Sequence, residues 1–255
     1  MLPEKSMKST GYGTFFEHLD ELRKRLVISL AAYFIALIPP LTCSGMLLNF
    51  VARPLAETVP SVYFFSPADA FVVKLKVCLL AAAVLSSPVI LGQFWIFISP
   101  ALYRNERRAL LPVIFITSGL FLAGALFAFT QVVPVALHFL IGMRTEFMQP
   151  LVSVSEYLSF VTSMVLAFGI AFNLPVFVLI LVGSGLVRAK TLNQFQRLVI
   201  LIIFIAAAVL TPGPDVASQL LLAIPLLILF EISVVCAMIL EKFRAKAAAK
   251  DIVVD

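Results

Sequence analysis

Six long apolar runs, separated by short segments that carry most of the charge, restrict what this sequence can fold into. Hydrophobic residues make up 62% of the chain and charged residues only 13%, which excludes a soluble globular domain. About 20 apolar residues suffice for a helix to cross the hydrocarbon core of a bilayer. The sequence therefore predicts an all-α, polytopic membrane protein with six transmembrane helices. The apolar runs are residues 26–43, 77–98, 109–134, 157–187, 198–212 and 216–240.

The last three runs differ in length and in how they are joined. The run 157–187 is long, but Pro175, Gly183 and Gly185 interrupt it, so we interpret it as one crossing plus a helical extension into the cytoplasm. The fifth run is shorter than a usual span, which predicts local thinning of the bilayer. The turn 211–215 (TPGPD) is so short that the fifth and sixth helices must be antiparallel neighbours.

The distribution of Lys and Arg predicts the orientation in the membrane, because cytoplasmic segments retain an excess of these residues. With the N-terminus inside, fifteen of these residues are cytoplasmic and four are external, so both termini are predicted to be cytoplasmic. We divide a single membrane domain, 1–255, into a cytoplasmic amphipathic entrance, six transmembrane helices and a cytoplasmic tail. The entrance is 1–25, the helices are 26–43, 71–98, 109–134, 157–182, 195–211 and 215–240, and the tail is 241–255.

The entrance contains a densely charged helix. A helical projection places Phe15, Leu19, Leu22 and Leu26 on one side and Glu17, Asp20, Glu21 and Lys24 on the other, which faces water. Asp20 and Glu21 each have a cation four residues on, Lys24 and Arg25, whereas Glu17 has only carboxylates at those offsets. Glu17 is therefore a candidate ligand for a basic group. The alternative is a solvated helix whose Arg23, Lys24 and Arg25 only fix the orientation.

The two external loops are also apolar in part. The larger, 44–70, is predicted to lie as a short cap on the membrane surface. The segment 135–140 of the second loop is apolar enough to rest in the outer interface. Cys43 and Cys78 both lie near the outer face, which leaves a disulfide bond between them open.

Two polar residues inside apolar runs are candidates for function, because such residues are costly in a membrane. Glu231 lies about 24 Å along its helix from Asp215 at 1.5 Å per residue, near the inner interface. It either has a functional role or pairs with a loop cation. Asn173 precedes Leu174 and Pro175, where its amide could satisfy the carbonyl that Pro175 leaves unpaired. A small-solute carrier that uses Asn173 and Glu231 as a polar path is the rival interpretation.

Known catalytic and nucleotide-binding motifs are missing from the sequence. The three cysteines and two histidines show no metal-ligand spacing, so we expect no enzyme, no cofactor and no metal. The net charge of +5 is explained by the cytoplasmic loops and the lipid surface they face, without a nucleic-acid partner.

Several motifs in order along nearly the whole chain resemble the TatC family, a component of the Sec-independent twin-arginine protein translocase. They are residues 17–25 (EHLDELRKR), 66–71 (SPADAF), 94–108 (FWIFISPALYRNERR), 168–175 (FGIAFNLP) and 211–219 (TPGPDVASQ). The resemblance implies a receptor of the bacterial cytoplasmic (inner) membrane, shaped like a cupped hand, with short fifth and sixth helices. It implies binding of the twin-arginine signal peptides of folded cargo, export of that cargo driven by the proton-motive force, and association with further copies of the chain.

The resemblance also implies roles for individual residues. Glu17 and Glu106 would hold the arginine pair on the cytoplasmic face, with Glu21 close by. Small single-helix partners of the TatA and TatB type would pack along the fifth and sixth helices. The polar positions there and within the membrane are Thr211, Asp215, Gln219, Glu231 and Asn173. Family members usually carry Glu or Gln where this chain has Asn173, so a protonation role at that position is not expected here.

Overall fold

The fold is almost entirely helical in a computed structural model that describes residues 11–58, 63, 66–102, 110–142, 152–187, 189–210 and 216–251. The elements are α1 (Gly11–Thr42), α2 (Ser44–Ala56), α3 (Asp69–Leu102), α4 (Leu110–Phe127), η2 (Ala128–Val132), α5 (Val133–Gly142), α6 (Val154–Ala171), α7 (Leu174–Gly183), α8 (Ala189–Gln194), α9 (Gln196–Leu210) and α10 (Val216–Asp251). In this described part of the chain, extended pairing is limited to one bridge between Tyr63 and Ser153.

The helices match the predicted all-α membrane fold. Within the described part of the chain, five segments are long and apolar enough to cross a bilayer: Glu17–Thr42, Asp69–Ile98, Leu110–Gly142, Val154–Gly183 and Leu222–Phe243. The fifth predicted helix corresponds to the shorter apolar helix Gln196–Val209, which confirms that it is short. The sixth is not short, because α10 has 36 residues. Its tail after Phe243 is rich in Ala and Lys, which favour helix.

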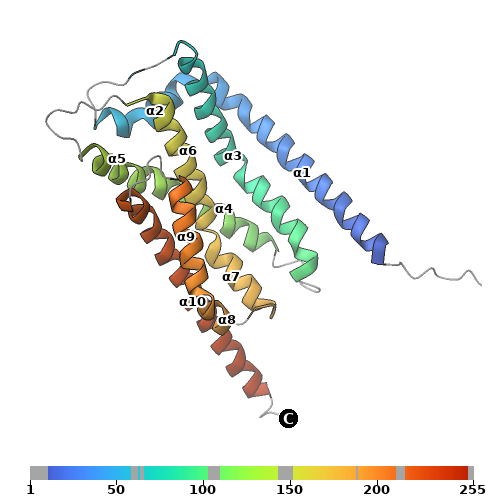
Figure 1. The fold of residues 1–255 in the computed structure, drawn as a ribbon. Coiled ribbons are helices and arrows are strands. Elements are labelled where there is room, and N and C mark those ends of the chain that lie inside the picture. Colours follow the sequence, from blue (N-terminus) through green and yellow to red (C-terminus); the bar gives the residue numbers. More distant parts are fainter. Residues whose placement is uncertain are drawn as a thin grey trace, which may run out of the picture.

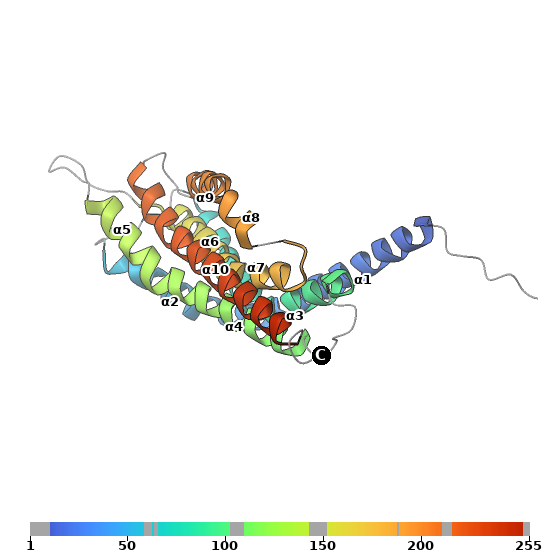
Figure 2. The ribbon, with the colours of Figure 1, turned by 90° about the horizontal axis from the view of Figure 1, so that it is seen from below.

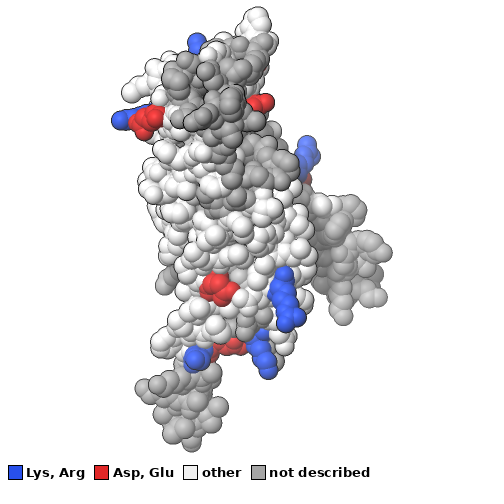
Figure 3. All heavy atoms as spheres, turned by 60° about the vertical axis from the view of Figure 1, so that its left-hand side comes forward, with Lys and Arg blue, Asp and Glu red and all other residues white. Residues whose placement is uncertain are grey.

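Most of the long helices run side by side, and α2 turns off the upper end of α1 to lie across the bundle (Figure 1). The start of α1 and the end of α10 both lie toward the lower side of that view, as the predicted cytoplasmic location of both termini requires. Charged side chains gather toward the two ends of the molecule, with a broad uncharged band between them (Figure 3). Such a band is what a hydrocarbon core requires.

The first helix lies at the edge of the bundle. Its start extends away from the other helices (Figure 2), and α1 packs mainly along α3. Only 6% of the most apolar window in Glu17–Thr42 is buried, compared with 28–39% in the other spans. Most of α1 therefore faces lipid, and contacts with α3 fix its position.

The third crossing is longer than the predicted 109–134. The wider turn η2 follows α4 and leads directly into α5, so the helix continues to Gly142 and the expected interfacial segment 135–140 is part of it. Pro134 has no N–H to offer the carbonyl of Thr130, and a local π-helical turn accommodates this loss. The cap predicted for the first external loop contains α2.

The central helix of the bundle is α6. Leu158, Val161, Met164 and Phe168 on it are fully buried. It approaches α4 closely at Gly124, where an added Cβ would lie 2.5 Å from the carbonyl oxygen of Phe168. Small residues allow such backbone approach between membrane helices. The run 157–187 divides into α6 and α7. After α7 ends at Gly183, Gly185 has a φ of 78°, the left-handed conformation typical of a residue that follows a helix.

Candidate functional site

An aromatic contact joins the beginning of α1 to the end of α3. The ring of His18 stacks on that of Phe97, with 4.4 Å between centroids and 15° between planes. Phe97 lies five residues before the last residue of α3, Leu102. The contact therefore holds the charged entrance helix beside the point where the chain leaves α3 for the loop that contains Glu106.

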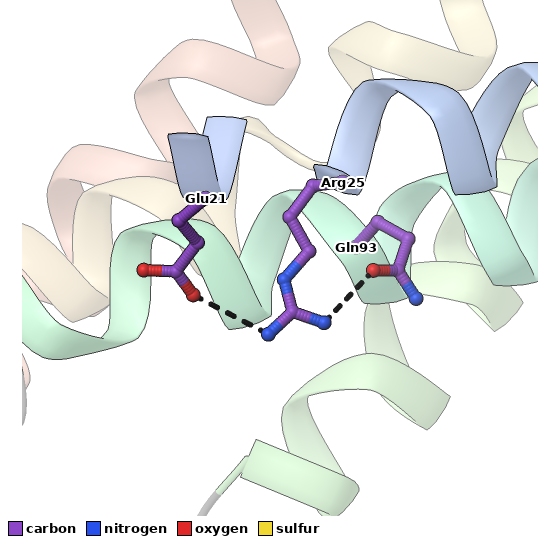
Figure 4. A network of polar contacts seen from close by, with 3 residues as sticks. All are labelled: Glu21, Arg25 and Gln93. Atoms are coloured by element: carbon purple, nitrogen blue, oxygen red, sulfur yellow. Dashed lines mark hydrogen bonds and ion pairs between the residues drawn. The ribbon is translucent and has the colours of Figure 1, made fainter. Parts of the chain in front are cut away.

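A polar network lies one turn further along the same two helices (Figure 4). Arg25 forms an ion pair with Glu21, with 3.3 Å from Nη2 to Oε1. Its other terminal nitrogen, Nη1, donates a hydrogen bond of 3.1 Å to Oε1 of Gln93 on α3. Of the two ion pairs that the sequence spacing predicts, this one is confirmed. The other, between Asp20 and Lys24, is absent from the described part of α1, where both residues are exposed.

The polar face of α1 was predicted to face water, but in the structure part of it faces α3. The side chains of Arg25 and Glu21 are only 26% and 34% exposed, because both point toward α3. The leucines of the opposite side, Leu19, Leu22 and Leu26, are exposed. A lipid environment explains this arrangement, since apolar side chains lose nothing by facing hydrocarbon whereas paired charges gain from contact with other polar groups.

Glu17 lies at the open end of this network. It is exposed and has no ion pair with the described residues, as the sequence spacing predicts. Its carboxylate and that of Glu21 are one helical turn apart, so both belong to the same part of α1. The structure therefore combines a free carboxylate with one held by an arginine.

Three of the predicted site residues lie outside the described residues: Glu106, Thr211 and Asp215. Glu106 follows the last residue of α3 by four positions. Thr211 and Asp215 belong to the connection between α9 and α10. Their roles stay predictions.

Asn173 caps a backbone carbonyl, but not the expected one. Its side-chain nitrogen donates to the carbonyl of Gly169 at 2.9 Å, rather than to that of Ala171, which Pro175 leaves without a donor. The backbone N–H of Asn173 bonds Ile170 instead, so the Gly169 carbonyl is free to accept the amide. The amide oxygen, Oδ1, is buried without a partner among the described groups.

Two side chains of α10 bind α9. Gln219 donates to the carbonyl of Phe204 at 2.8 Å, and Gln196 donates to Oε1 of Glu231. These bonds join the two helices at the start and in the middle of α9, and they agree with the predicted antiparallel pairing. Among the described residues, the hydrogen bonds of Asn173 and Glu231 go to Gly169 and Gln196 and not to each other.

The cysteines are free thiols. Cys43 is exposed, and Cys78 is buried with its Sγ 3.3 Å from the carbonyl of Pro40. The bridge that the sequence left open is therefore not formed. No group of three His, Cys, Asp or Glu that could hold a metal occurs among the described residues.

Three polar contacts were missed by sequence reasoning. Gln93 and Gln196 bind the charged residues described above, and Lys76 on α3 donates to Ser155 and Ser159 on α6, the latter at 2.7 Å. The sequence did contain a signal for these contacts. An amide or ammonium group in or beside an apolar run needs a polar partner there. Which partner each finds depends on helix packing.

Comparisons with known proteins agree with these features. A family model described as Sec-independent protein translocase protein (TatC) matches residues 17–225. A Sec-independent protein translocase protein TatC of Carboxydothermus hydrogenoformans is 39% identical over 224 residues, 88% of this chain and 92% of that protein. One from Aquifex aeolicus is 40% identical over 222 residues, 86% and 92% of the two chains.

Solved structures show the same similarity. A crystal structure of the twin-arginine translocase receptor TatC superposes with a TM-score of 0.80 at 39% identity, covering 88% of this chain and 99% of the other. A second, determined in DDM, gives a TM-score of 0.81 at 38% identity and covers 86% and 99%.

Proposed function

This chain belongs to the TatC family and is a component of the Sec-independent twin-arginine translocase, and we propose that within it the chain is the receptor for twin-arginine signal peptides. A translocase component is a transporter subunit rather than an enzyme. The observation that carries the proposal is that Glu17 and Glu21 lie on the part of α1 that contacts the end of α3, the helix that Glu106 follows by four positions in sequence. The signal arginines would be bound there, on the cytoplasmic face.

The chemistry of the site suits arginine. A guanidinium presents several N–H groups in a plane and binds a carboxylate through two parallel hydrogen bonds, which an ammonium cannot do. Arg25 contacts one oxygen of Glu21, Oε1, and leaves Oε2 for a ligand. Because Arg25 already orders this carboxylate, binding there costs less conformational entropy than binding at a freely moving side chain.

Chain length limits how far Glu106 can lie from the end of α3. An extended chain covers about 3.5 Å per residue, so four residues place its Cα within about 14 Å of the end of α3. We therefore include Glu106 in the site with Glu17 and Glu21. Arg107 and Arg108 follow it in sequence, and pairing within the loop is the competing role for its carboxylate.

Partner subunits of the TatA and TatB type would pack along α9 and the adjoining part of α10. The outer face of α9 is apolar and exposed at Leu198, Leu201, Ile202, Ile205 and Val209. Thr211, Asp215, Gln219 and Glu231 are the candidate polar contacts for these partners. We place the complex in the bacterial inner membrane, with further copies of the chain and the proton-motive force as energy source. For Asn173 we propose a structural role, in which its side chain stabilises the interruption between α6 and α7.

The test is crosslinking of a twin-arginine signal peptide carrying a photoreactive group beside the arginines. Glu17→Gln, Glu21→Gln and Glu106→Gln should each weaken it, because each removes the negative charge of the acceptor and so weakens a hydrogen bond worth about 1.5–3 kcal/mol. Asp20→Asn is the matched control, since Asp20 is an exposed carboxylate of the same helix. Unchanged crosslinking in all three variants, with normal membrane insertion, would refute the site.

A further inference from the structure

An apolar groove lies beneath α2, bordered by α1, α3 and α4, on a part of the molecule that the proposed receptor function does not use. Its volume is about 710 Å³. Every lining residue is apolar except Cys43. The groove includes Pro39 of α1, Met46 and Phe50 of α2, Leu85 of α3 and Leu126 of α4.

The groove has a buried floor and an open rim. Val51, Val77, Leu80 and Ala125 at the floor are buried. On the rim, Met46 is 79% exposed and Leu126 is 61% exposed. The walls on α3 and α4 belong to predicted membrane spans, so the rim faces hydrocarbon. An unfilled groove there would deprive its walls of dispersion contacts, and a flexible hydrocarbon chain would restore them.

The groove is as long as one leaflet rather than the whole bilayer. Its wall on α3 extends from Val77 to Leu85, about 12 Å at 1.5 Å per residue, whereas one leaflet of the hydrocarbon core measures about 15 Å. The helix α2, which lies across the upper end of the bundle (Figure 1), lines its outer end. A transmembrane helix from a partner or a second copy would collide with α2, but a chain that ends at a headgroup would fit.

A pair of opposite charges continues the same face of α2 beyond the groove. Met46, Phe50, Arg53 and Glu57 follow one another at spacings of four, three and four residues, so they share one side of the helix. Nε of Arg53 bonds Oε1 of Glu57 at 3.2 Å, and both side chains are mostly exposed. In the described residues, the two terminal nitrogens of Arg53 have no other partner.

We propose that this groove binds one acyl chain of a zwitterionic phospholipid of the outer leaflet. Its phosphate lies on the terminal nitrogens of Arg53, which match phosphate oxygens in geometry and charge. Its ammonium lies on the remaining carboxylate oxygen of Glu57. Phe50 and Arg53 are one turn apart, about 4.5 Å along α2, so the charged pair is at headgroup distance from the groove.

The native Cys43 thiol reports occupancy of the groove, because it is exposed and lines the groove. The purified full chain in detergent is reacted with a maleimide, with and without phosphatidylethanolamine. Lipid at ten times its Kd should slow the reaction of Cys43 about tenfold and leave that of Cys236, on α10, unchanged. Arg53→Gln should remove most of the protection, whereas Lys74→Gln, at an exposed cation of α3, should not.

A second experiment tests which lipid headgroup is bound. Phosphatidylglycerol, which has the phosphate but no amine, should protect less than phosphatidylethanolamine, and Glu57→Gln should abolish the difference. Native mass spectrometry should show one tightly held phospholipid per chain, lost in Ala81→Phe, which fills the groove. Three results would overturn the proposal. The first is equal protection of Cys43 by an alkane without a headgroup, and the second is protection that Arg53→Gln does not change. The third is protection that depends on protein concentration, which would indicate a second copy of the chain.

Discussion

Arg25 on α1 donates a hydrogen bond to Gln93 on α3, with 3.1 Å between Nη1 and Oε1. The two residues are 68 positions apart in sequence, and their contact fixes the rotation of α1 about its axis. Glu21, bound to the same guanidinium, is thereby held against α3. The geometry of the proposed receptor site thus depends on an uncharged side chain that no charge pattern in the sequence identifies.

Replacing Gln93 by Leu should destabilise the α1–α3 contact. The change leaves one terminal nitrogen of a half-buried guanidinium without its acceptor, which costs about 1–3 kcal/mol. Thermal unfolding in detergent measures the effect. Gln93→Glu keeps an acceptor oxygen and should retain most of the stability. Equal unfolding temperatures for the Leu and Glu variants would show that the hydrogen bond contributes nothing.

The close approach of α4 and α6 provides a test of packing. Gly124→Val should destabilise the protein by about 1–3 kcal/mol or more, as overpacking in a core does, because its Cβ would collide with the backbone oxygen of Phe168. Gly119→Val is the matched control on the same helix, since nothing lies within 4 Å of a Cβ added there. Similar losses in both variants would mean that the helical propensity of valine, and not the clash, determines the outcome.

A buried phenol helps to attach α2 to the bundle, beside the buried apolar residues Val51 and Leu55. The hydroxyl of Tyr157 donates to the carbonyl of Val51 at 2.7 Å, so Tyr157→Phe should cost about 1 kcal/mol. Hydrogen exchange of the amides in α2 should accelerate in this variant. Tyr33→Phe removes a longer bond of 3.2 Å, to Leu79, away from α2, and should leave that exchange unchanged. Unaltered exchange in Tyr157→Phe would contradict this role.

The sequence predicted the helical spans well, because apolar length alone decides whether a segment crosses a membrane. It also predicted the pair of Glu21 and Arg25, since four residues form one helical turn. It could not predict that this pair turns toward α3, or that Gln93 and Gln196 bind charged residues. Those contacts depend on the rotation of each helix in the bundle, which local periodicity does not determine.

The interruption of the helix at Asn173 also shows that residue spacing alone does not determine which groups pair. Proximity to Pro175 correctly predicted that the amide would satisfy a backbone carbonyl. The carbonyl is that of Gly169, because the N–H of Asn173 shifts to Ile170 and releases it. Such shifts of register within one turn depend on the actual backbone path and are not specified by residue spacing.

The central claim is that carboxylates at the α1–α3 junction recognise paired guanidinium groups. The most direct measurement compares the Kd of a twin-arginine peptide with that of its twin-lysine counterpart, using the purified chain in lipid nanodiscs. The wild-type chain should bind the arginine peptide at least about tenfold more tightly, which corresponds to 1.4 kcal/mol. The preference should vanish in the triple variant Glu17→Gln, Glu21→Gln, Glu106→Gln. A preference for arginine that survives in this variant would contradict the account.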